Sequence, residues 1–507
     1  MLKKQERKEL RALYSDMKQL RREVFEEGNA LYANWEPAVR RTSFKVSAKN
    51  LAYYLALRRR DVRPLQERLS DWGLSSLGRA ESKVLPQMDN IIRNVALMTG
   101  EVKQLEKYPF AIEDFPGRKK LTDEANLILG STPKNRSTRI MVTLSSQAAE
   151  EKDYLVRLLE SGMGIARINC AHDDAETWQR MVANLQEAQK QTGKNCKVYF
   201  DIAGPKVRVR SVISTMEKPR LKVADTFFLT AVAAFAADQQ LPLVLRCNNE
   251  ELVQQLKVGD AVILDDGTLD GKVVERKPEG VIVQVEKTAK TKGIKVKAEK
   301  GLNFPDTAIE IPLITQKDRQ DIQTVQANAD MLGFSFVKGL GDIRSIQSVL
   351  AELLDAEKAE AIPLVLKIET VKAVDHLPEL IVAAASKNPL AIMIARGDLA
   401  AEAGFLRLPE LQEEILWICE AAHIPVIWST QVLENMVKTG IPTRAEMTDA
   451  TMAGQAECVM LNKGEFLNEA ITLLDAILTQ TQNNQTKKSA KLRSLKIAEK
   501  AWKKAKK

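Results

Sequence analysis

Eight short apolar runs recur through the middle of this chain, and they constrain its fold more than any other feature. The runs are residues 139–144, 164–169, 197–202, 329–336, 362–366, 389–394, 424–430 and 456–461. Runs of four to eight apolar residues are typical of strands that are buried on both faces of a sheet. Amphipathic helical patterns lie between most of them, at 150–161, 175–192, 315–327 and 408–422. Alternating strands and helices of this number predict an α/β fold, a parallel (β/α)8 TIM barrel.

Charged and polar residues stand where several of these runs end. Lys367 and Glu369 close one run, and Asp398 follows the next. Alternate residues of a strand point to the same side, so Lys367 and Glu369 should share a face. Unpaired buried charge is costly, and the set therefore suggests a divalent metal beside a phosphate. The strand ends of the barrel as a whole carry Arg167, Asn169, Asp201, Lys367, Glu369, Asp398 and Thr430.

Each of these residues also has a purely structural interpretation. Lys367 with Glu369 could form a buried ion pair. Arg167 could pair with Asp201 for the same reason, and Thr430 could be an ordinary hydroxyl at a strand end. What favours function is that the residues should meet at the C-terminal face, where barrels of this type place their chemistry.

A segment with a different hydrophobicity pattern interrupts the barrel after its third strand. Residues 209–302 alternate in polarity and are rich in β-branched residues, with turn signals such as Asp265-Asp266-Gly267. This pattern predicts a small inserted β domain. The barrel would then comprise residues 137–208 and 303–480. A β domain on two connections over the catalytic face is well placed to act as a lid.

The N-terminal residues 1–133 read as a helical domain. A charged helix over 3–27 should end at Gly28, and Ser47 should cap a helix that runs through Arg60. Residues 481–507 form a lysine-rich tail, for which we expect a solvated, frayed helix end.

The charge of the chain is confined to that tail. The whole chain carries +8, whereas residues 487–507 hold ten Lys or Arg and one Glu, so the remainder is close to neutral at −1. We therefore expect no specific nucleic-acid partner. No run of 18 apolar residues and no secretory leader is found, and the five cysteines form no Cys-x-x-Cys pair. These features predict a cytoplasmic protein without a membrane span or a structural zinc.

Ordered motifs across residues 137–480 resemble the pyruvate kinase family. The motifs include Gly162-Met-Gly-Ile-Ala-Arg-Ile-Asn, the stretch from Asp201 to Arg208, Lys300-Gly-Leu-Asn-Phe-Pro, Lys367-Ile-Glu, Ala395-Arg-Gly-Asp-Leu, Ser429-Thr-Gln-Val-Leu-Glu-Asn-Met and Pro442-Thr-Arg-Ala-Glu. Each motif alone is weak, but together and in this order they are specific. The resemblance implies transfer of a phosphoryl group from phosphoenolpyruvate to ADP, which yields pyruvate and ATP, and we also expect a homo-oligomer.

The resemblance also implies roles for particular residues. Glu369 and Asp398 match the ligands of Mg²⁺ or Mn²⁺, and Lys367 and Arg167 match the cations on the transferring phosphoryl group. Thr430 matches the threonine of the proton path to the enolate. Residues that match substrate or nucleotide contacts are Gly397, Asp398 and Asn169 for the substrate and His172, Arg208 and Lys300 for the nucleotide.

Potassium-independent members of the family resemble this chain in one loop. The chain reads Asp201-Ile-Ala-Gly-Pro-Lys206, where potassium-dependent members carry glutamate at the last position. The Lys206 ammonium could replace the ion, with Asp201 as its partner, and Ala171 removes a hydroxyl that the ion would use. We therefore expect no requirement for K⁺.

Two departures from the family leave other functions open. The last strand is followed by Asn462-Lys-Gly-Glu-Phe instead of Ser-Gly-Glu-Thr, and only the lysine-rich tail follows the barrel where many members have a further α/β domain. The alternatives are a catalytically silent paralogue with a binding role and a Mg²⁺-dependent lyase that acts on pyruvate enolate.

Overall fold

We describe the fold from a computed structural model of the 507-residue chain. The structure describes residues 3–486 and 489–490, without 76, 102, 104, 106–116, 218, 234, 266 and 308–310. The lysine-rich tail predicted at 481–507 lies mostly outside the described residues. Among the described residues, no helix is both long and apolar enough to cross a membrane.

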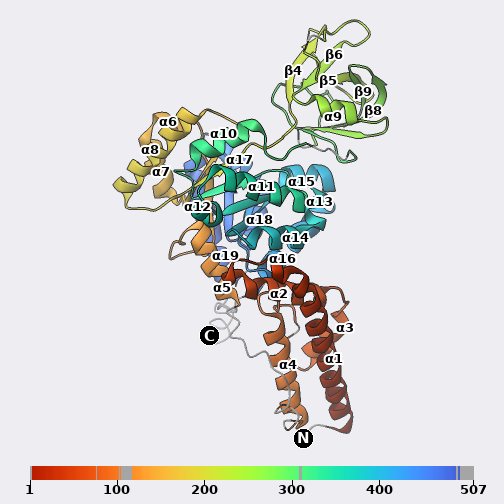
Figure 1. The fold of residues 1–507 in the computed structure, drawn as a ribbon, viewed down its shortest axis with the longest axis vertical. Helices are drawn as coiled ribbons and strands as arrows, with labels where there is room; N and C mark the ends of the chain where they lie inside the picture. The colour runs from red at the N-terminus through yellow and green to blue at the C-terminus, as the bar shows by residue number, and fades with distance from the viewer. Residues whose placement is uncertain are drawn as a thin grey trace, which may run out of the picture.

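A closed barrel of eight parallel strands forms the centre of the molecule and confirms the predicted fold class (Figure 1). Around the barrel, the strands follow one another in the order β1, β15, β14, β13, β12, β11, β3 and β2. Their bounds are β1 Arg139–Thr143, β2 Ile165–Asn169, β3 Lys197–Asp201, β11 Met331–Phe334, β12 Leu364–Ile368, β13 Leu390–Ala395, β14 Val426–Ser429 and β15 Cys458–Leu461. All eight predicted runs are strands, because each is apolar enough to be covered on both faces.

Helices surround the barrel, as expected for strands joined by right-handed crossovers. The four predicted helical patterns correspond to α7, α8, α10 and α16. The bounds are α6 Gln147–Glu150, α7 Lys152–Ser161, α8 Ala175–Thr192, α10 Gln316–Val325, α11 Leu340–Leu353, α12 Ala356–Ala361, α13 Val371–Asp375, α14 Leu377–Ala385, α15 Arg396–Ala403, α16 Leu408–Ala421, α17 Glu434–Thr439, α18 Arg444–Ala453 and α19 Leu467–Asn484.

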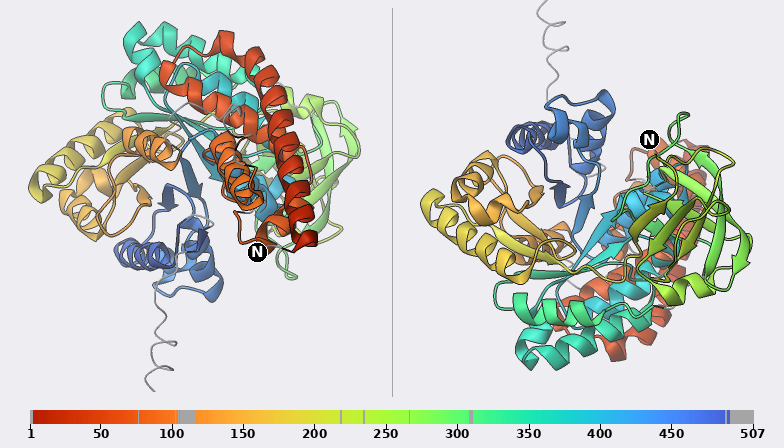
Figure 2. Two further views of the ribbon diagram at one scale, coloured as in Figure 1. Left: turned by 90° about the horizontal axis from the view of Figure 1, so that it is seen from below. Right: turned by 90° about the horizontal axis from the view of Figure 1, so that it is seen from above.

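The β-rich segment between β3 and β11 forms a separate sheet with its own apolar core. The strands are β4 Val209–Ser214, β5 Thr226–Thr230, β6 Leu243–Cys247, β7 Ala261–Leu264, β8 Leu269–Lys277, β9 Gly280–Thr288 and β10 Leu302–Asn303, and α9 spans Glu250–Gln255. Figure 2 shows this sheet on the side of the barrel opposite the N-terminal helices. Asp265 begins the turn between β7 and β8, as expected from its turn motif.

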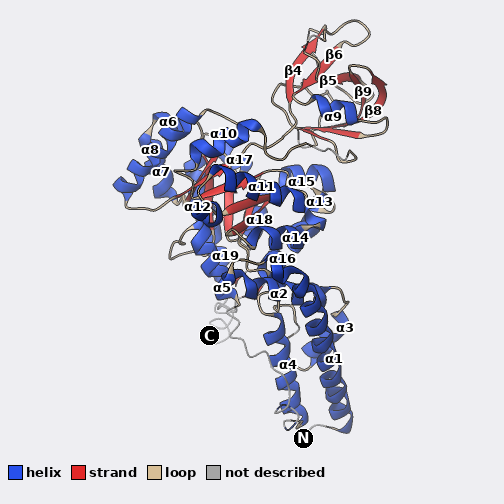
Figure 3. Cartoon of the chain, in the orientation of Figure 1, coloured by secondary structure: helices blue, strands red, loops and turns tan. Residues whose placement is uncertain are grey.

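The N-terminal region is helical; α2 lies against the barrel, whereas α1 and α4 extend away from it (Figure 3). Its elements are α1 Lys4–Trp35, η1 Glu36–Ala38, α2 Thr42–Arg58, α3 Arg63–Asp71, α4 Val84–Thr99 and α5 Arg118–Leu129. The prediction that Gly28 ends the first helix is wrong. Gly28 lies inside α1 because Tyr53 of α2 packs against it, and a Cβ at residue 28 would lie 2.3 Å from the Tyr53 ring. Helix packing therefore overrides the low helix propensity of glycine.

The prediction that Ser47 caps a helix is also wrong, and the reason is an interdomain contact. The helix α2 begins five residues earlier, at Thr42, and the Ser47 hydroxyl bonds Nδ1 of His423 at 2.9 Å. His423 precedes β14, so this contact lies at the N-terminal end of the barrel. Nearby, Asn50 donates to the carbonyl oxygen of Ala421 at 2.8 Å, and Arg41 donates to that of Asn388 at 2.8 Å. Through these buried polar contacts the helical region covers the lower face of the barrel.

Candidate active site

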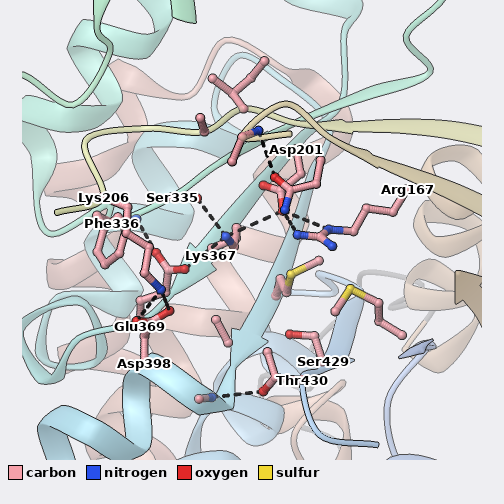
Figure 4. A pocket seen from close by; sticks show the side chains of 18 of the residues that line it. Arg167, Asp201, Lys206, Ser335, Phe336, Lys367, Glu369, Asp398, Ser429 and Thr430 are labelled. Carbon is pink, nitrogen blue, oxygen red and sulfur yellow. Dashed lines mark hydrogen bonds and ion pairs between the residues drawn. The ribbon is translucent and has the colours of Figure 1, made fainter. Parts of the chain in front are cut away.

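A polar cavity of about 180 Å³ opens at the C-terminal ends of the barrel strands. Figure 4 shows that its labelled side chains converge from several different strands and loops. The sequence-predicted residues that line it are Arg167, Asn169, Asp201, Lys206, Arg208, Lys367, Glu369, Gly397, Asp398 and Thr430. The cavity thus collects most of the predicted site at the face where the fold predicts chemistry.

One side of the cavity is built around the carboxylate of Asp201 (Figure 4). Its Oδ2 accepts two hydrogen bonds from the Arg167 guanidinium, at 2.9 and 2.5 Å, and lies 3.6 Å from the Lys367 ammonium. Burial opposes the ionisation of Asp201, yet the positive charges of Lys367 and Arg167 hold its pKa below the ordinary value. Arg167 and Asp201 therefore form an ion pair, and Arg167 and Lys367 place two cations on the cavity wall.

Lys367 is held by three acceptors at the end of β12. Besides Asp201, its Nζ lies 3.1 Å from Oε1 of Glu369 and 2.8 Å from the Ser335 hydroxyl. Burial lowers the pKa of the ammonium, but the negative charges of Asp201 and Glu369 raise it above its ordinary value overall. Lys367 is therefore a fixed cation, because its carboxylate neighbours stabilise the charged form.

Glu369 is deeply buried, and burial raises the pKa of its carboxyl group in spite of Lys367. Its Oε2 accepts the backbone N–H of Phe336 at 2.5 Å. Phe336 follows β11 with a positive φ of 58°, a conformation that non-glycine residues rarely adopt. The strained turn after β11 therefore orients Glu369, and its preceding residue Ser335 orients Lys367.

Asp398 lies in the first turn of α15. Its carboxylate accepts hydrogen bonds from both segments that connect the barrel to the β domain. Lys206 reaches its two carboxylate oxygens at 2.9 and 3.0 Å, and the Asn303 side-chain amide donates to Oδ1 at 3.3 Å. Burial opposes ionisation, but the charge of Lys206 lowers the pKa of Asp398 below its ordinary value. The prediction that Asp201 pairs with Lys206 is therefore corrected: the loop carries Lys206 to Asp398, while Asp201 turns to Arg167 and Lys367.

Thr430 and Gly397 meet at the end of β14. The Gly397 N–H donates to the Thr430 hydroxyl at 3.0 Å, and Thr430 itself has a positive φ of 62°. The preceding residue, Arg396, donates to the carbonyl oxygens of Ser429 and Thr430 and pairs with Asp449. These bonds fix an unusual backbone that presents the Thr430 hydroxyl to the cavity.

The donor set suits a hard divalent cation. Glu369, which follows β12, is buried, and Asp398, in the first turn of α15, is partly buried; both line one cavity. Two carboxylates with open positions for water and substrate oxygens are the usual protein contribution to a Mg²⁺ site. Within the described part of the chain, no group of three or more His, Cys, Asp or Glu could hold a metal by itself. A metal here would therefore need substrate or water ligands as well.

Two predicted nucleotide residues lie away from the cavity lining. Lys300 pairs with Asp265 inside the β domain at 2.9 Å. His172 lies in the loop after β2, where burial and the positive charges of Lys463 and Arg208 lower its pKa. Arg208 lines the cavity, and its guanidinium donates to the carbonyl oxygen of Glu299 at 3.0 Å. The cations Arg208 and Lys300 lie close to the paired connections between the barrel and the β domain, whereas the lowered pKa favours the neutral form of His172.

Sequence reasoning missed Ser335, Phe336 and Asn303. Ser335 and Phe336 stand at the end of a predicted strand, and this position alone could have marked them as candidate site residues. Their contacts depend on the turn after β11 and could not be inferred from residue type. Asn303 belongs to a recognised motif, but its bond to Asp398 joins residues 95 positions apart in the chain.

Comparison with known proteins identifies the family. Residues 135–471 match the model of the pyruvate kinase barrel domain. The chain is 32% identical over 356 residues to a pyruvate kinase of Geobacillus stearothermophilus, covering 68% of this chain and 57% of that protein. A pyruvate kinase of Eimeria tenella is 30% identical over 355 residues, with 68% and 63% covered. The chain thus spans about three fifths of the length of these relatives.

A solved structure agrees with the sequence comparisons. The crystal structure of a pyruvate kinase from Cryptosporidium parvum matches with a TM-score of 0.59 and 25% identity, and the match covers 70% of this chain and 72% of that one. The barrel strands, the sheet inserted after β3 and the charged residues at the strand ends all lie within residues 135–471, which the family model matches. This chain therefore belongs to the pyruvate kinase family.

Proposed function

We propose that this protein transfers a phosphoryl group from phosphoenolpyruvate to ADP and yields pyruvate and ATP. One observation carries the proposal: two fixed cations, Arg167 and Lys367, share a single cavity with two carboxylates, the buried Glu369 and the partly buried Asp398. Phosphoryl transfer requires positioning and neutralisation of charge more than covalent chemistry. The relatives named pyruvate kinase support this assignment.

The cations would act on the phosphoryl group as negative charge develops on it. Arg167 is held by two hydrogen bonds to Oδ2 of Asp201, and Lys367 is held by three acceptors. Donors that are fixed in advance stabilise a transition state without reorganising during the reaction. Asn169 lies beside Arg167 at the end of β2 and would contact the same group.

Glu369 and Asp398 would hold Mg²⁺ or Mn²⁺, which would neutralise charge on the substrate oxygens. Lys367 keeps the buried Glu369 paired, and Lys206 keeps Asp398 paired. The N–H groups of Gly397 and Asp398, at the start of α15, would receive the carboxylate of phosphoenolpyruvate, which would replace the Thr430 hydroxyl as the acceptor of the Gly397 N–H. Thr430 would take part in delivering the proton to the enolate, since its hydroxyl faces the cavity from β14.

The nucleotide would bind on the outer side of the cavity. Arg208, His172 and Lys300 lie between the barrel and the β domain and would contact its phosphates. Arg208 lies on the connection to the β domain, and its bridge to Gly301 joins the two connections. Movement of the β domain would bring Lys300 towards the barrel, as expected for a lid.

A coupled assay tests the proposal directly. Purified protein should form pyruvate from phosphoenolpyruvate and ADP, and a chelator such as EDTA should abolish the rate until excess Mg²⁺ is added. A folded protein that binds phosphoenolpyruvate and Mg²⁺ without forming pyruvate would contradict the proposal. That result would favour a catalytically silent paralogue.

A further inference from the structure

A single tyrosine interrupts the apolar interior of the barrel beneath the candidate active site. Tyr199 lies on β3 two residues before Asp201, so both side chains point into the barrel. Tyr199 is 0% exposed and Asp201 is 1% exposed. Tyr199 belongs to a buried cluster whose other members are apolar, among them Met141, Met331, Val365 and Met393.

Space for the phenol comes from the adjacent strand. Gly333 of β11 pairs with Asp201 in the sheet register, and a Cβ at residue 333 would lie 2.0 Å from the Tyr199 hydroxyl oxygen. No side chain could occupy that position together with the tyrosine. The tyrosine therefore extends across β11 with its hydroxyl in the barrel interior, instead of turning towards solvent.

Two buried polar atoms are unsatisfied at this place. Among the described residues, neither the hydroxyl of Tyr199 nor Oδ1 of Asp201 has a hydrogen-bond partner of standard geometry. Oδ2 of the same carboxylate already accepts two hydrogen bonds from Arg167 and lies close to the Lys367 ammonium. A buried donor or acceptor without a partner costs free energy, and these two atoms are complementary, since a phenol donates and a carboxylate accepts.

Burial and the charge of Asp201 both favour the protonated phenol. Burial raises the pKa of Tyr199 well above its ordinary value, and the charge of Asp201 raises it further. The phenol therefore keeps its proton across the working pH range, and it remains a donor. A donor at this depth favours the ionised form of Asp201, as the two cations do.

We propose that Tyr199 is a positioning residue: its hydroxyl donates to Oδ1 of Asp201 and fixes the carboxylate that orients Arg167 and Lys367. The catalytic part of this inference rests on the proposed function, whereas the hydrogen bond itself does not. One bond then satisfies both buried atoms and leaves Oδ2 to the two cations.

Kinetics test the catalytic part. Tyr199→Phe removes only the hydroxyl, and we expect it to lower kcat about tenfold while KM for phosphoenolpyruvate and ADP stays within about twofold. Tyr14→Phe is the matched control, because Tyr14 of α1 is also buried with an unpartnered hydroxyl but lies in the N-terminal helices. It should leave both constants unchanged. An unchanged kcat for Tyr199→Phe, or a raised KM alone, would overturn the positioning role.

Equilibrium unfolding tests the hydrogen bond without any reference to activity. Tyr199→Phe should destabilise the wild-type protein, and it should destabilise an Asp201→Asn variant clearly less, because the charged acceptor is then gone. Equal destabilisation in both backgrounds would show that the phenol has another partner and would overturn the bond. If the wild-type protein forms no pyruvate, the proposed function fails, and the unfolding cycle still decides whether Tyr199 bonds Asp201.

Discussion

Ser335 shows how much of this site depends on a residue that does not itself carry charge. Its hydroxyl accepts a hydrogen bond from Lys367 at 2.8 Å, and Ser335 is almost fully buried. Replacement by alanine should leave the lysine charged, because Asp201 and Glu369 remain, but less well oriented. We expect Ser335→Ala to lower kcat about fivefold with little change in KM.

A matched control separates this effect from loss of a buried hydroxyl in general. Ser386 is equally buried at the opposite end of the barrel, where its hydroxyl donates to the carbonyl oxygen of Val382. Ser386→Ala should lower stability slightly and leave kcat unchanged. Equal losses of kcat in both variants would indicate a general effect on the fold.

Lys367 should act on the chemical step. Its ammonium is fixed by three acceptors at the centre of the cavity, so Lys367→Met removes a charge aimed at the migrating phosphoryl group. We expect kcat to fall by about a hundredfold or more, with little change in apparent affinity for phosphoenolpyruvate. Lys197→Met is the control, because Lys197 pairs with Asp330 at the other end of β3. A folded Lys367→Met variant with normal kcat would remove Lys367 from the mechanism.

At the scale of single elements, we expect the loop after β3 to decide whether the protein needs a monovalent cation. Gly204 in this loop has a φ of 66°, and a Cβ added to it would lie 3.3 Å from Cβ of Ser335. Two residues later, the Lys206 ammonium donates to the Asp398 carboxylate. The lysine ammonium already supplies a positive charge at the carboxylate. We expect the protein to work at nearly full rate in tetramethylammonium salts.

Two substitutions test that role at constant ionic strength. Lys206→Glu would place a carboxylate against Asp398 and should abolish most activity, because like charges at this distance repel. Lys206→Met removes the charge without repulsion and should cause a smaller loss. A wild-type rate that rises more than about tenfold on addition of KCl would contradict independence from K⁺.

The contact between α2 and the barrel should make stability depend on pH. Burial lowers the pKa of His423 to about 4 from 6.5. The Nε2 atom faces the carbonyl oxygen of Ser82 and must carry the proton of the neutral ring, so Nδ1 accepts from Ser47. The unfolded chain binds a proton at higher pH than the folded protein does. The stabilisation is therefore complete above pH 6.5 and is lost as the pH falls towards 4, by about 3 kcal/mol in total.

A substitution at residue 423 isolates this effect. His423 has a positive φ of 53°, and asparagine tolerates that conformation better than most residues do. Urea unfolding between pH 4.5 and 7.5 should therefore show a flatter dependence on pH for His423→Asn than for the wild type. Parallel curves for the two proteins would mean that other groups cause the dependence.

The elements that could be predicted from sequence are those set by local pattern. The eight strands were predicted because each is an unbroken apolar run, and the inserted sheet because its residues alternate in polarity. The predictions for Gly28 and Ser47 were wrong because these residues contact Tyr53 and His423, and no local sequence pattern reveals such contacts. The site residues were found by type and strand position, but the pairing of Lys206 with Asp398 depends on the path of a loop.

At the scale of the whole molecule, Asp398 links the candidate metal site to the orientation of the β domain. Lys206 lies on the connection that leaves the barrel, Asn303 lies on the one that returns, and both bond the same carboxylate. The two connections also bond each other, since the N–H of Leu302 donates to the carbonyl oxygen of Val207 at 2.9 Å. We therefore expect them to move together. Any ligand that binds the Asp398 carboxylate must compete with these hydrogen bonds, and it would thereby weaken the attachment of the two connections to the barrel.

We therefore expect Asp398→Asn to free the β domain as well as to impair binding of divalent cations. Removing the charge weakens the bond to Lys206, because charge-assisted bonds are about twice as strong as neutral ones. Hydrogen exchange at residues 206–209 and 300–303 should then become faster than in the wild type, whereas exchange in β12 and β13 should not change. Asp238→Asn is the control, since Asp238 accepts from the N–H groups of Gln240 and Leu241 in a loop of the β domain. Unaltered exchange at both connections in Asp398→Asn would show that Asp398 does not hold the β domain.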